Sequence, residues 1–185
     1  MVQEQIDDGR ARMHKAVESL RNELGSVRTG RASAGLVEHL RVDYYGAPTP
    51  LNQLATISTP DARLIVIQPY DRGAMGAIEK SILKSDLGLT PSNDGAVIRL
   101  SIPPLTDERR RELAKHVRKR VEEGRVAVRN VRRDCHDHIR KLEHDRTISQ
   151  DDLHRSETEL QKLTDEQVNE IDKVGEVKEQ ELLVI

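Results

Sequence analysis

The sequence predicts an α+β protein in which a three-helix bundle is interrupted by a small α+β domain. Three long segments place apolar residues at steps of three and four, the spacing of a helix with one buried face. The stretch 36–104, between the first and second of these segments, instead contains short runs in which apolar and polar residues alternate, as they do in strands. Each helical seam is too narrow to be stable alone, so we expect the three helices to pack together across the insert.

Residues 2–28 form the first predicted helix. Its apolar seam follows the steps of a helical bundle and consists of Ile6, Met13, Val17, Leu20, Leu24 and Val27. The pattern stops in the segment 28–35, where Gly30, Gly35 and several small residues predict a break in the helix.

Residues 36–104 are predicted to fold as a compact unit with several strands. Alternating patterns predict strands at 40–45 and 98–102, and the β-branched run 64–67 predicts a buried strand between them. Residues 46–50 contain one glycine and two prolines, which predicts a turn.

A short helix is predicted inside the same unit. Met75, Ile78 and Ile82 have the spacing of a helix with one apolar face. We expect this helix to end near Gly88, because glycine readily adopts the left-handed conformation that closes many helices.

Two further helices follow the insert. Thr106 and the acidic residues after it predict a helix start, and this second helix is expected to span 106–146. Ser149 is expected to cap the third helix. Residues 164–167 resemble a capping box, but the apolar spacing continues through them, so we expect no break there. The seam of the second helix consists of Leu113, Val117, Val121, Gly124, Val128, Val131, Cys135, Ile139 and Leu142.

The predicted domains follow from this order of segments. Residues 1–29 and 106–185 are assigned to the bundle, and residues 30–105 are assigned to the inserted domain. Two short connections, near 29–35 and 102–105, are expected to form a hinge between the two domains. The residues expected to form this hinge are Gly30, Gly35, Pro103 and Pro104.

Charge is distributed unevenly along the helical segments. Residues 105–146 contain 14 Lys and Arg against 9 Asp and Glu, a net charge of +5. Residues 147–185 contain 4 against 11, a net charge of −7. Such asymmetry indicates one surface suited to a polyanion, although an acidic segment can equally be a solvated face.

Arginines follow the buried seam of the second helix. They recur at steps of three and four, displaced by one residue from the apolar positions, and arginine is the side chain best suited to bidentate phosphate contact. This row favours an RNA-binding or other polyanion-binding surface. A solvated face with internal pairs such as Glu122 with Arg125 is the alternative. The row consists of Arg118, Arg125, Arg129, Arg132 and Arg140.

Several function classes are disfavoured by composition. The chain has no Trp, no Phe and three Tyr, whereas binders of single-stranded nucleic acid usually stack bases on aromatic rings. One cysteine cannot form an internal disulfide, which favours a reducing, cytoplasmic location. On a helix, Cys135 is expected to point into the apolar seam, and His136 and His138 point in different directions, whereas metal ligands on a helix are spaced by three or four residues on one face. We identify no metal, cofactor or catalytic site, and no apolar run long enough to cross a membrane.

Six segments, taken in their order and spacing, resemble motifs of the bacterial ribosome recycling factor family. They cover the first connection, two places in the insert, the second connection, the arginine-rich part of the second helix, and one place in the third helix. These segments are 28–33, 43–51, 86–91, 103–110, 125–134 and 161–166.

The resemblance implies a fold and a task. The fold of this family is an L-shaped, two-domain structure with an antiparallel three-helix bundle and a small β/α/β domain. Its members bind the ribosome after termination, at the large-subunit RNA near the A and P sites. With elongation factor G and GTP they split the subunits and release mRNA and tRNA, and they hydrolyse nothing themselves. We expect this chain to act as a cytoplasmic monomer with the same partners and no membrane contact.

The resemblance also implies which arginines contact ribosomal RNA. Asn130 lies in the same motif. The competing class is a helical-bundle module for protein interaction or assembly, which would bind through an exposed apolar patch with little salt dependence. The matching candidates for RNA binding are Arg28, Arg31, Arg110, Arg129, Arg132 and Arg133.

Overall fold

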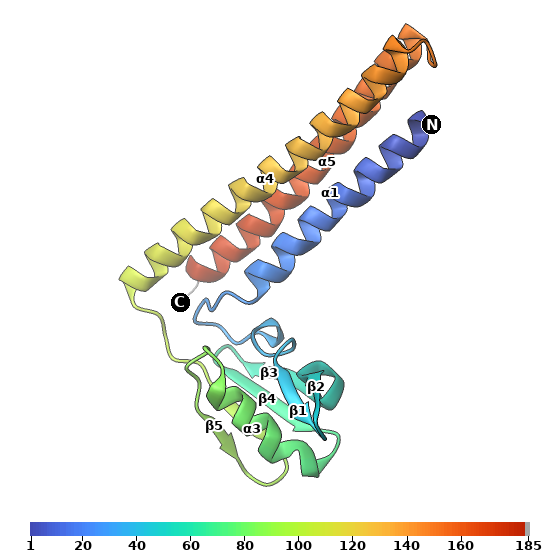
Figure 1. The fold of residues 1–185 in the computed structure, drawn as a ribbon. Helices are drawn as coiled ribbons and strands as arrows, with labels where there is room; N and C mark the ends of the chain where they lie inside the picture. Colours follow the sequence, from blue (N-terminus) through green and yellow to red (C-terminus); the bar gives the residue numbers. More distant parts are fainter. Residues whose placement is uncertain (184–185) are drawn as a thin grey trace. The chain divides into compact units, whose positions relative to one another are not determined.

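The structure is a computed structural model that describes residues 1–183. Its chain divides into two compact units (Figure 1). The first contains Met1–Leu24 and Glu112–Ile185, and the second is Gly25–Arg111. The last two residues of the predicted bundle segment, 184 and 185, lie outside the described residues.

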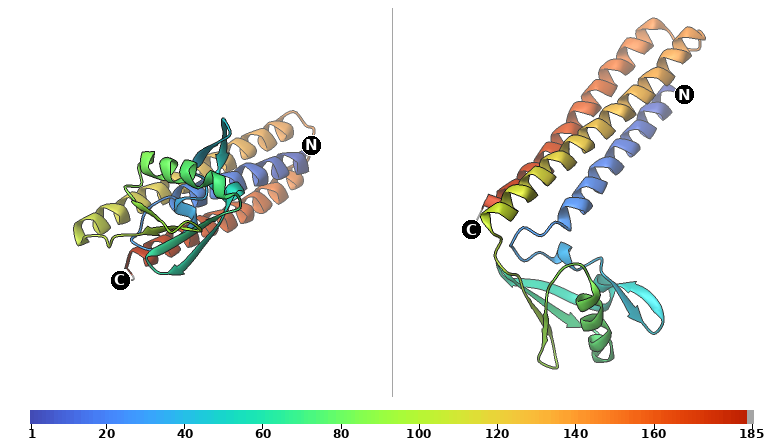
Figure 2. Two further views of the ribbon diagram at one scale, coloured as in Figure 1. Left: turned by 90° about the horizontal axis from the view of Figure 1, so that it is seen from below. Right: turned by 60° about the vertical axis from the view of Figure 1, so that its left-hand side comes forward.

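The first unit is a bundle of three helices. The first predicted helix ends at Gly25 rather than at residue 28, and the second spans nearly the predicted residues. Figures 1 and 2 show that α4 runs antiparallel to both of its neighbours. The helices are α1 (Val2–Gly25), α4 (Asp107–His144) and α5 (Gln150–Leu183).

The predicted seams, except Val27, form the core of this bundle; Val27 lies beyond the end of α1, in the second unit. Residues buried from the three helices include Met13 of α1, Val117 of α4 and Ile171 of α5. Glycines bring the backbones close together: a Cβ built on Gly175 of α5 would lie 2.6 Å from Cγ2 of Val121. The interior is therefore packed across all three helices, which makes the bundle a rigid body.

The start of α5 confirms the predicted cap. The backbone N–H of Asp152 donates to Oγ of Ser149 at 3.1 Å, and this hydroxyl donates to Oδ2 of Asp152 at 2.6 Å. The expected absence of a break at 164–167 is also confirmed, because α5 is continuous there. The Thr164 hydroxyl donates to the carbonyl of Leu160 at 2.7 Å, so it bonds within the helix instead of capping a new one.

The second unit contains two antiparallel sheets. A hairpin joins β1 to β2, and the other four strands form a sheet in the order β3-β4-β6-β5. The strands are β1 (Arg41–Tyr44), β2 (Ala47–Pro50), β3 (Ala55–Asp61), β4 (Leu64–Pro69), β5 (Pro91–Asn93) and β6 (Ile98–Ser101). The helical segments are η1 (Ala34–Leu36), α2 (Leu51–Leu54), η2 (Arg72–Ala74) and α3 (Met75–Lys84).

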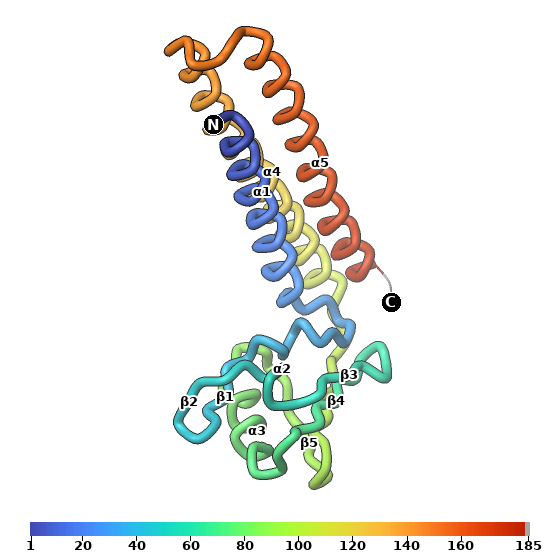
Figure 3. The backbone as a smooth tube through the Cα atoms, turned by 90° about the vertical axis from the view of Figure 1, so that its right-hand side faces the viewer, coloured from blue at the N-terminus to red at the C-terminus, as the bar shows by residue number. Residues whose placement is uncertain are grey.

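Apolar side chains of α3 and of the strands form the core of this unit. Ile78 of α3, Val42 of β1 and Ile65, Ile67 and Leu100 of the larger sheet are fully buried. Figure 3 traces the β1–β2 hairpin beside α3. The alternation that predicted β1 and β6 thus corresponds to one face against this core, and the apolar run that predicted a buried strand lies in β4.

Three features of this unit differ from the sequence-based expectations. Residues 46–50 are not only a turn, because 47–50 pair with β1 as strand β2. Strands β3 and β5 were not predicted; both are edge strands with mostly exposed side chains, so their apolar pattern is weak. Helix α3 ends at Lys84, before Gly88, because the backbone at Ser85 turns to an extended conformation.

The division between the units also differs from the predicted boundaries. Residues 25–29 and 106–111 belong to the second unit by their contacts, although they were assigned to the bundle. Nη1 of Arg28 donates to the carbonyl of Leu87 in the insert at 3.3 Å, and Leu105 of the second connection lies against Gly30 of the first.

Candidate nucleic-acid interface

The arginine row of α4 divides into paired and unpaired members. Arg125 is tied to α5, with Nη2 2.6 Å from Oδ1 of Asp172, and Nη1 lies 2.8 Å from Oε2 of Glu122. Hydrogen bonds to Glu122 and Asp172 raise the pKa of Arg125 above its ordinary value. Arg118 donates from Nε to Oε1 of Glu179 at 2.9 Å. These two arginines join α4 to α5, so for Arg125 the predicted alternative of an internal pair with Glu122 is confirmed.

Three arginines further along α4 remain exposed and largely free of acidic partners. Nη1 of Arg129 lies 3.5 Å from Oε1 of Glu122, a long contact between two exposed side chains. Nη1 of Arg132 donates to the neutral Oε1 of Gln161 at 3.1 Å. Arg133 forms no ion pair among residues 1–183. We call Arg129, Arg132 and Arg133 the α4 arginine cluster.

The cluster is held by the buried seam beneath it. Val128 and Val131 directly precede Arg129 and Arg132 in the sequence, and both valines are buried in the bundle. A helix fixed on its inner face presents its outer side chains from a rigid backbone. Gln161 is itself oriented, because its Nε2 donates to Oδ1 of Asp165 at 2.8 Å, which leaves its carbonyl oxygen for Arg132. The positive charge of Arg132 therefore stays available to an external anion.

The other three predicted RNA-binding arginines lie in the second unit. Arg31 is exposed, and Arg28 and Arg110 are half-buried. The Nε atoms of Arg28 and Arg110 are buried without a hydrogen-bond partner in the described part of the chain. The structure thus brings Arg129, Arg132 and Arg133 together in the middle of α4. Arg110 lies in the first turn of the same helix, and Arg28 and Arg31 lie in the segment that follows α1.

The predicted hinge residues lie in these same connections. Gly30 has a φ of +78°, and a Cβ built on it would lie 3.2 Å from Cγ of Leu105, so the first connection contacts the second. A Cβ on Gly35 would lie 3.1 Å from the carbonyl oxygen of Gly25. Pro103 and Pro104 are exposed and belong to no helix or strand. The two connections are therefore tight as well as short.

The cysteine and histidine segment of α4 has separate partners for each side chain. Cys135 is buried beside Gly9, and burial raises the pKa of its thiol. Nε2 of His136 lies 3.0 Å from Oε1 of Glu157 on α5, and Nδ1 of His138 lies 2.7 Å from the carbonyl oxygen of Asp134. Within residues 1–183 no three His, Cys, Asp or Glu side chains are grouped to hold a metal.

No helix in residues 1–183 combines the length and the apolar character needed to cross a membrane.

Comparison with known proteins places these features in a family. The sequence model described as ribosome recycling factor matches residues 20–183, which contain the α4 arginine cluster and both connections. The chain belongs to the ribosome recycling factor family.

Relatives in this family match the chain from end to end. The ribosome-recycling factor of Chloroflexus aggregans is 57% identical, and that of Geobacillus kaustophilus is 56% identical. In both cases the match covers 100% of this chain and 100% of the relative.

Solved structures of the family have the same fold. The chain matches a solution structure of the ribosome recycling factor with a TM-score of 0.82 and 46% identity, over 100% of this chain and 98% of that one. It also matches, with a TM-score of 0.74 and 48% identity over both full chains, the factor in models of the T. thermophilus ribosome recycling factor and the E. coli elongation factor G bound to the E. coli post-termination complex.

The residues of α5 that separate the arginines into two groups were not predicted from the sequence. Asp172 and Glu179 pair with Arg125 and Arg118, whereas neutral Gln161 faces Arg132. The step of seven residues from Asp172 to Glu179 places both acids on one face of α5. This spacing is the feature of the sequence that could have indicated a shared partner helix. Which arginines they meet depends on the register between α4 and α5.

Proposed function

We propose that the chain recycles ribosomes. It binds the ribosome after termination at the large-subunit RNA near the A and P sites. With elongation factor G and GTP it splits the subunits and releases mRNA and tRNA. Membership of the ribosome recycling factor family, with full-length relatives more than half identical, supports this function.

The observation that carries the proposed RNA contact is the unneutralised charge of the α4 arginine cluster. Arg118 and Arg125 already bind acids of α5, but Arg132 faces a neutral amide and Arg133 has no ion pair in residues 1–183. Phosphates can replace water around such guanidinium groups without breaking an internal ion pair. Arg28, Arg31 and Arg110 are proposed as further contacts to ribosomal RNA.

The hinge supplies the proposed movement. Elongation factor G pushes the inserted domain about the two connections while the bundle stays bound to RNA. Packed helices resist bending more than short connections do, so the movement is concentrated near 29–35 and 102–105. Gly30, Gly35, Pro103 and Pro104 are the proposed hinge residues.

The factor is proposed to work without chemistry of its own. GTP hydrolysis belongs to elongation factor G, and the chain acts as a cytoplasmic, monomeric binding factor without a cofactor. The cytoplasmic location and the monomeric state are thus proposed for this chain in addition to its family membership.

A subunit-splitting assay tests the proposal. Post-termination ribosomes are mixed with the factor, elongation factor G and GTP, and splitting is followed by light scattering. We expect splitting only when all three are present, and we expect its rate to fall at least tenfold in the variant Arg129→Ala/Arg132→Ala/Arg133→Ala at limiting factor concentration, since charge-assisted contacts contribute about 1.5–3 kcal/mol each.

The matched control is Arg118→Ala. This variant removes an arginine from the same helix, but one that already pairs with Glu179. It should split ribosomes like the wild type. Equal loss of activity in the control and the triple variant would show that the cluster has no special role, and splitting without elongation factor G would contradict the proposed mechanism.

A further inference from the structure

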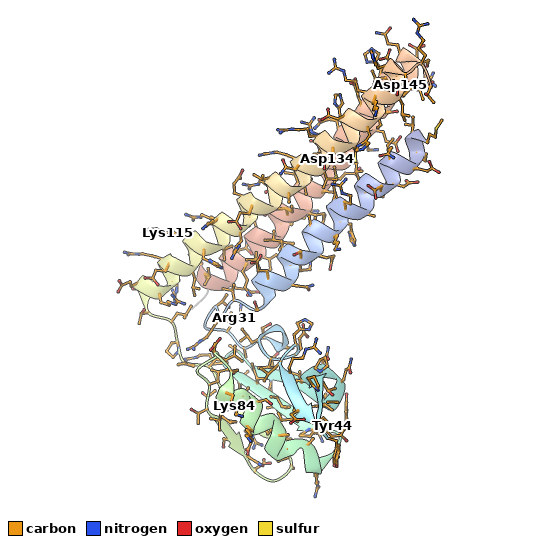
Figure 4. All side chains as sticks on the ribbon, viewed as in Figure 1. Arg31, Tyr44, Lys84, Lys115, Asp134 and Asp145 are labelled. Carbon is orange, nitrogen blue, oxygen red and sulfur yellow. The ribbon has the colours of Figure 1, made fainter. Side chains whose placement is uncertain are left out.

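A basic cleft lies in the second unit, between the β1–β2 hairpin and α3. It has a volume of about 550 Å³. Figure 4 labels Tyr44 on β1 and Lys84 on α3, the two elements that form its walls. Its lining residues are Arg41, Asp43, Gly46, Pro48, Ala77, Lys80, Ser81 and Lys84.

The charges of the cleft are not balanced by its own residues. Arg41, Lys80 and Lys84 form no ion pair with an acid anywhere in residues 1–183. Asp43 is the single acid in the lining, and its Oδ1 accepts a hydrogen bond at 2.9 Å from the backbone N–H of Gly46. Lys80 and Lys84 are one helical turn apart, so their charges lie along the same wall. The cleft is therefore suited to a ligand with several negative charges along its length.

A tyrosine ring is exposed in the turn that connects β1 to β2. The side chain of Tyr45, next to Gly46 of the lining, is 84% exposed. Its φ is +50°, a conformation that Asn or Gly adopts readily and that a bulky residue rarely adopts. The rings of Tyr44 and Tyr45 meet in a T-shaped arrangement with centroids 4.6 Å apart, and the hydroxyl of Tyr44 donates a hydrogen bond to Oδ2 of Asp71 at 3.1 Å. The fold thus holds an exposed ring where a small polar residue would suit the backbone better.

We propose that this cleft binds a single strand of RNA. Arg41, Lys80 and Lys84 hold its phosphates, and one base stacks on the exposed ring of Tyr45. None of these residues is among the six arginines proposed above, so this site is separate from the α4 arginine cluster. It gives the inserted domain an RNA contact of its own.

The exposed ring of Tyr45 favours RNA over an acidic protein segment. A carboxylate-rich peptide would use the cations of the cleft, but it has no need of a flat, exposed aromatic ring one residue from the lining. A nucleotide supplies both a phosphate for these cations and a base with a stacking face for such a ring. Few aromatics in the whole sequence disfavour a long stacking surface, but they are compatible with a site that stacks one base.

The first experiment locates the site in the full chain. The isotope-labelled protein is titrated at low salt with an eight-nucleotide oligoadenylate, and backbone amide shifts are recorded. We expect saturable shifts at 41–48 and 77–84. Shifts confined to α4 would overturn the cleft proposal while leaving the α4 arginine cluster intact. Equal affinity of an oligoglutamate of the same charge for the cleft would assign it to a protein and would also overturn the proposal.

Variants then test the lysines and the tyrosine separately. Lys80→Ala/Lys84→Ala should weaken oligoadenylate binding at the cleft amides at least fivefold and reduce the salt slope by about 1.4, since each contact with a single strand contributes about 0.7. The matched control Lys115→Ala/Lys119→Ala removes two exposed lysines, also one turn apart, from α4. It should leave the affinity of the cleft unchanged, and an equal loss in this control would contradict the site.

Tyr45→Asn distinguishes binding from a structural role. Asn tolerates a positive φ, so the variant should keep or raise the Tm of the protein. Loss of the ring should nevertheless weaken oligoadenylate binding about fivefold or more, the range measured for one stacked base. Unchanged affinity in a folded Tyr45→Asn variant would overturn the stacking role and, with it, the assignment to RNA.

Discussion

At the scale of single residues, the surroundings of an arginine determine its role more than its place in the sequence does. Arg125 and Arg132 lie on the same side of α4, seven residues apart. Arg125 is half-buried against Asp172, whereas Arg132 is exposed and faces a neutral glutamine. An exposed ion pair contributes about 0–1 kcal/mol to stability, so even the pairs of Arg125 stabilise the fold only slightly. Arg132 contributes less to folding and remains free to bind a ligand.

Arg132→Ala should weaken binding to the large ribosomal subunit about tenfold or more, because a charge-assisted contact to phosphate is lost. Its Tm should stay within about 1 °C of the wild type, since only the bond to Gln161 disappears. Arg132→Lys should lose less affinity than Arg132→Ala yet remain measurably weaker than wild type, because lysine keeps the charge without the guanidinium fork. Binding assays with isolated large subunits, paired with thermal unfolding, measure both quantities. Normal binding by Arg132→Ala, or unfolding of that variant, would argue against an RNA contact.

Asp94 predicts a pH effect in the β5–β6 turn. Its carboxylate accepts hydrogen bonds from the backbone N–H groups of Val97 and Ala96 and pairs with Arg99, and these interactions hold the pKa of Asp94 well below its usual range. A depressed pKa stabilises the folded state fully above the unfolded value of about 3.9, and this stabilisation is lost as the pH falls below it. Asp94→Asn should therefore lower the Tm at pH 7, and its difference from wild type should narrow below about pH 4.

The control for this pH profile is Asp61→Asn, which changes an exposed acid of β3 that has no ion pair among residues 1–183. Its Tm should follow the wild type across the same pH range. A constant difference between wild type and Asp94→Asn from pH 7 to pH 3 would show that the charge of Asp94 contributes nothing.

At the scale of elements, close contacts at glycines fix the register of the bundle. Gly9 lies against Cys135, Gly124 against Leu20 and Ile171, and Gly175 against Val121. A Cβ built at these three glycines would lie 2.7, 3.3 and 2.6 Å, respectively, from the nearest atom. These contacts join α1 to α4 and α4 to α5. They set which acids of α5 reach which arginines of α4, so packing at small residues determines the charge left exposed on the α4 surface.

Gly175→Ala should destabilise the bundle although alanine is the better helix former. The new Cβ would overlap with the buried, stiff side chain of Val121, and overpacking of this kind costs about 1–3 kcal/mol against a gain of up to about 1 kcal/mol in helix propensity. We expect the Tm to fall by about 2–6 °C in thermal unfolding.

The matched control is Gly76→Ala in α3, where nothing lies within 4 Å of the added Cβ. It should keep or raise the Tm, because only the propensity gain applies. A Gly175→Ala variant as stable as Gly76→Ala would mean that Val121 yields at no cost and that the contact does not fix the register.

Long elements with a repeating core face could be predicted from sequence, whereas short ones depended on their neighbours. Each bundle helix repeats its seam over several turns, so periodicity identified all three to within a few residues. Strand β5 has three residues, starts with Pro91 and is nearly all exposed, so it exists only because β6 offers it a partner. The division of the arginines into paired and free groups could not be predicted either, because it follows from the register of α4 against α5.

At the scale of the whole molecule, the chain forms two units that are joined by two short connections. Gly30 of the first connection has a positive φ, and a Cβ built on it would lie 3.2 Å from Cγ of Leu105 in the second connection. The two chain crossings therefore contact each other, and a side chain at Gly30 would disturb both. We propose that subunit splitting depends on movement at the connections, whereas binding to the large subunit depends chiefly on the α4 arginine cluster.

Gly30→Val should slow subunit splitting more than it weakens binding to the large subunit, because it alters the proposed hinge and leaves the α4 arginine cluster intact. Gly95→Ala is the control: it places a Cβ at another positive φ, in the β5–β6 turn, with nothing within 4 Å. That control should affect neither quantity beyond a small loss of Tm. Equal losses of splitting and binding in Gly30→Val would contradict the separation of hinge from RNA contact.

The central claim is that the α4 arginine cluster binds ribosomal RNA through phosphates. It is tested most directly by measuring the Kd for isolated large subunits over a series of salt concentrations, for the wild type and for Arg129→Ala/Arg132→Ala/Arg133→Ala. We expect a steep linear fall of log affinity with log salt, and a slope that is smaller by about 2–3 in the variant. A slope near zero for the wild type, or the same slope in both proteins, would contradict the claim and favour a protein-interaction module.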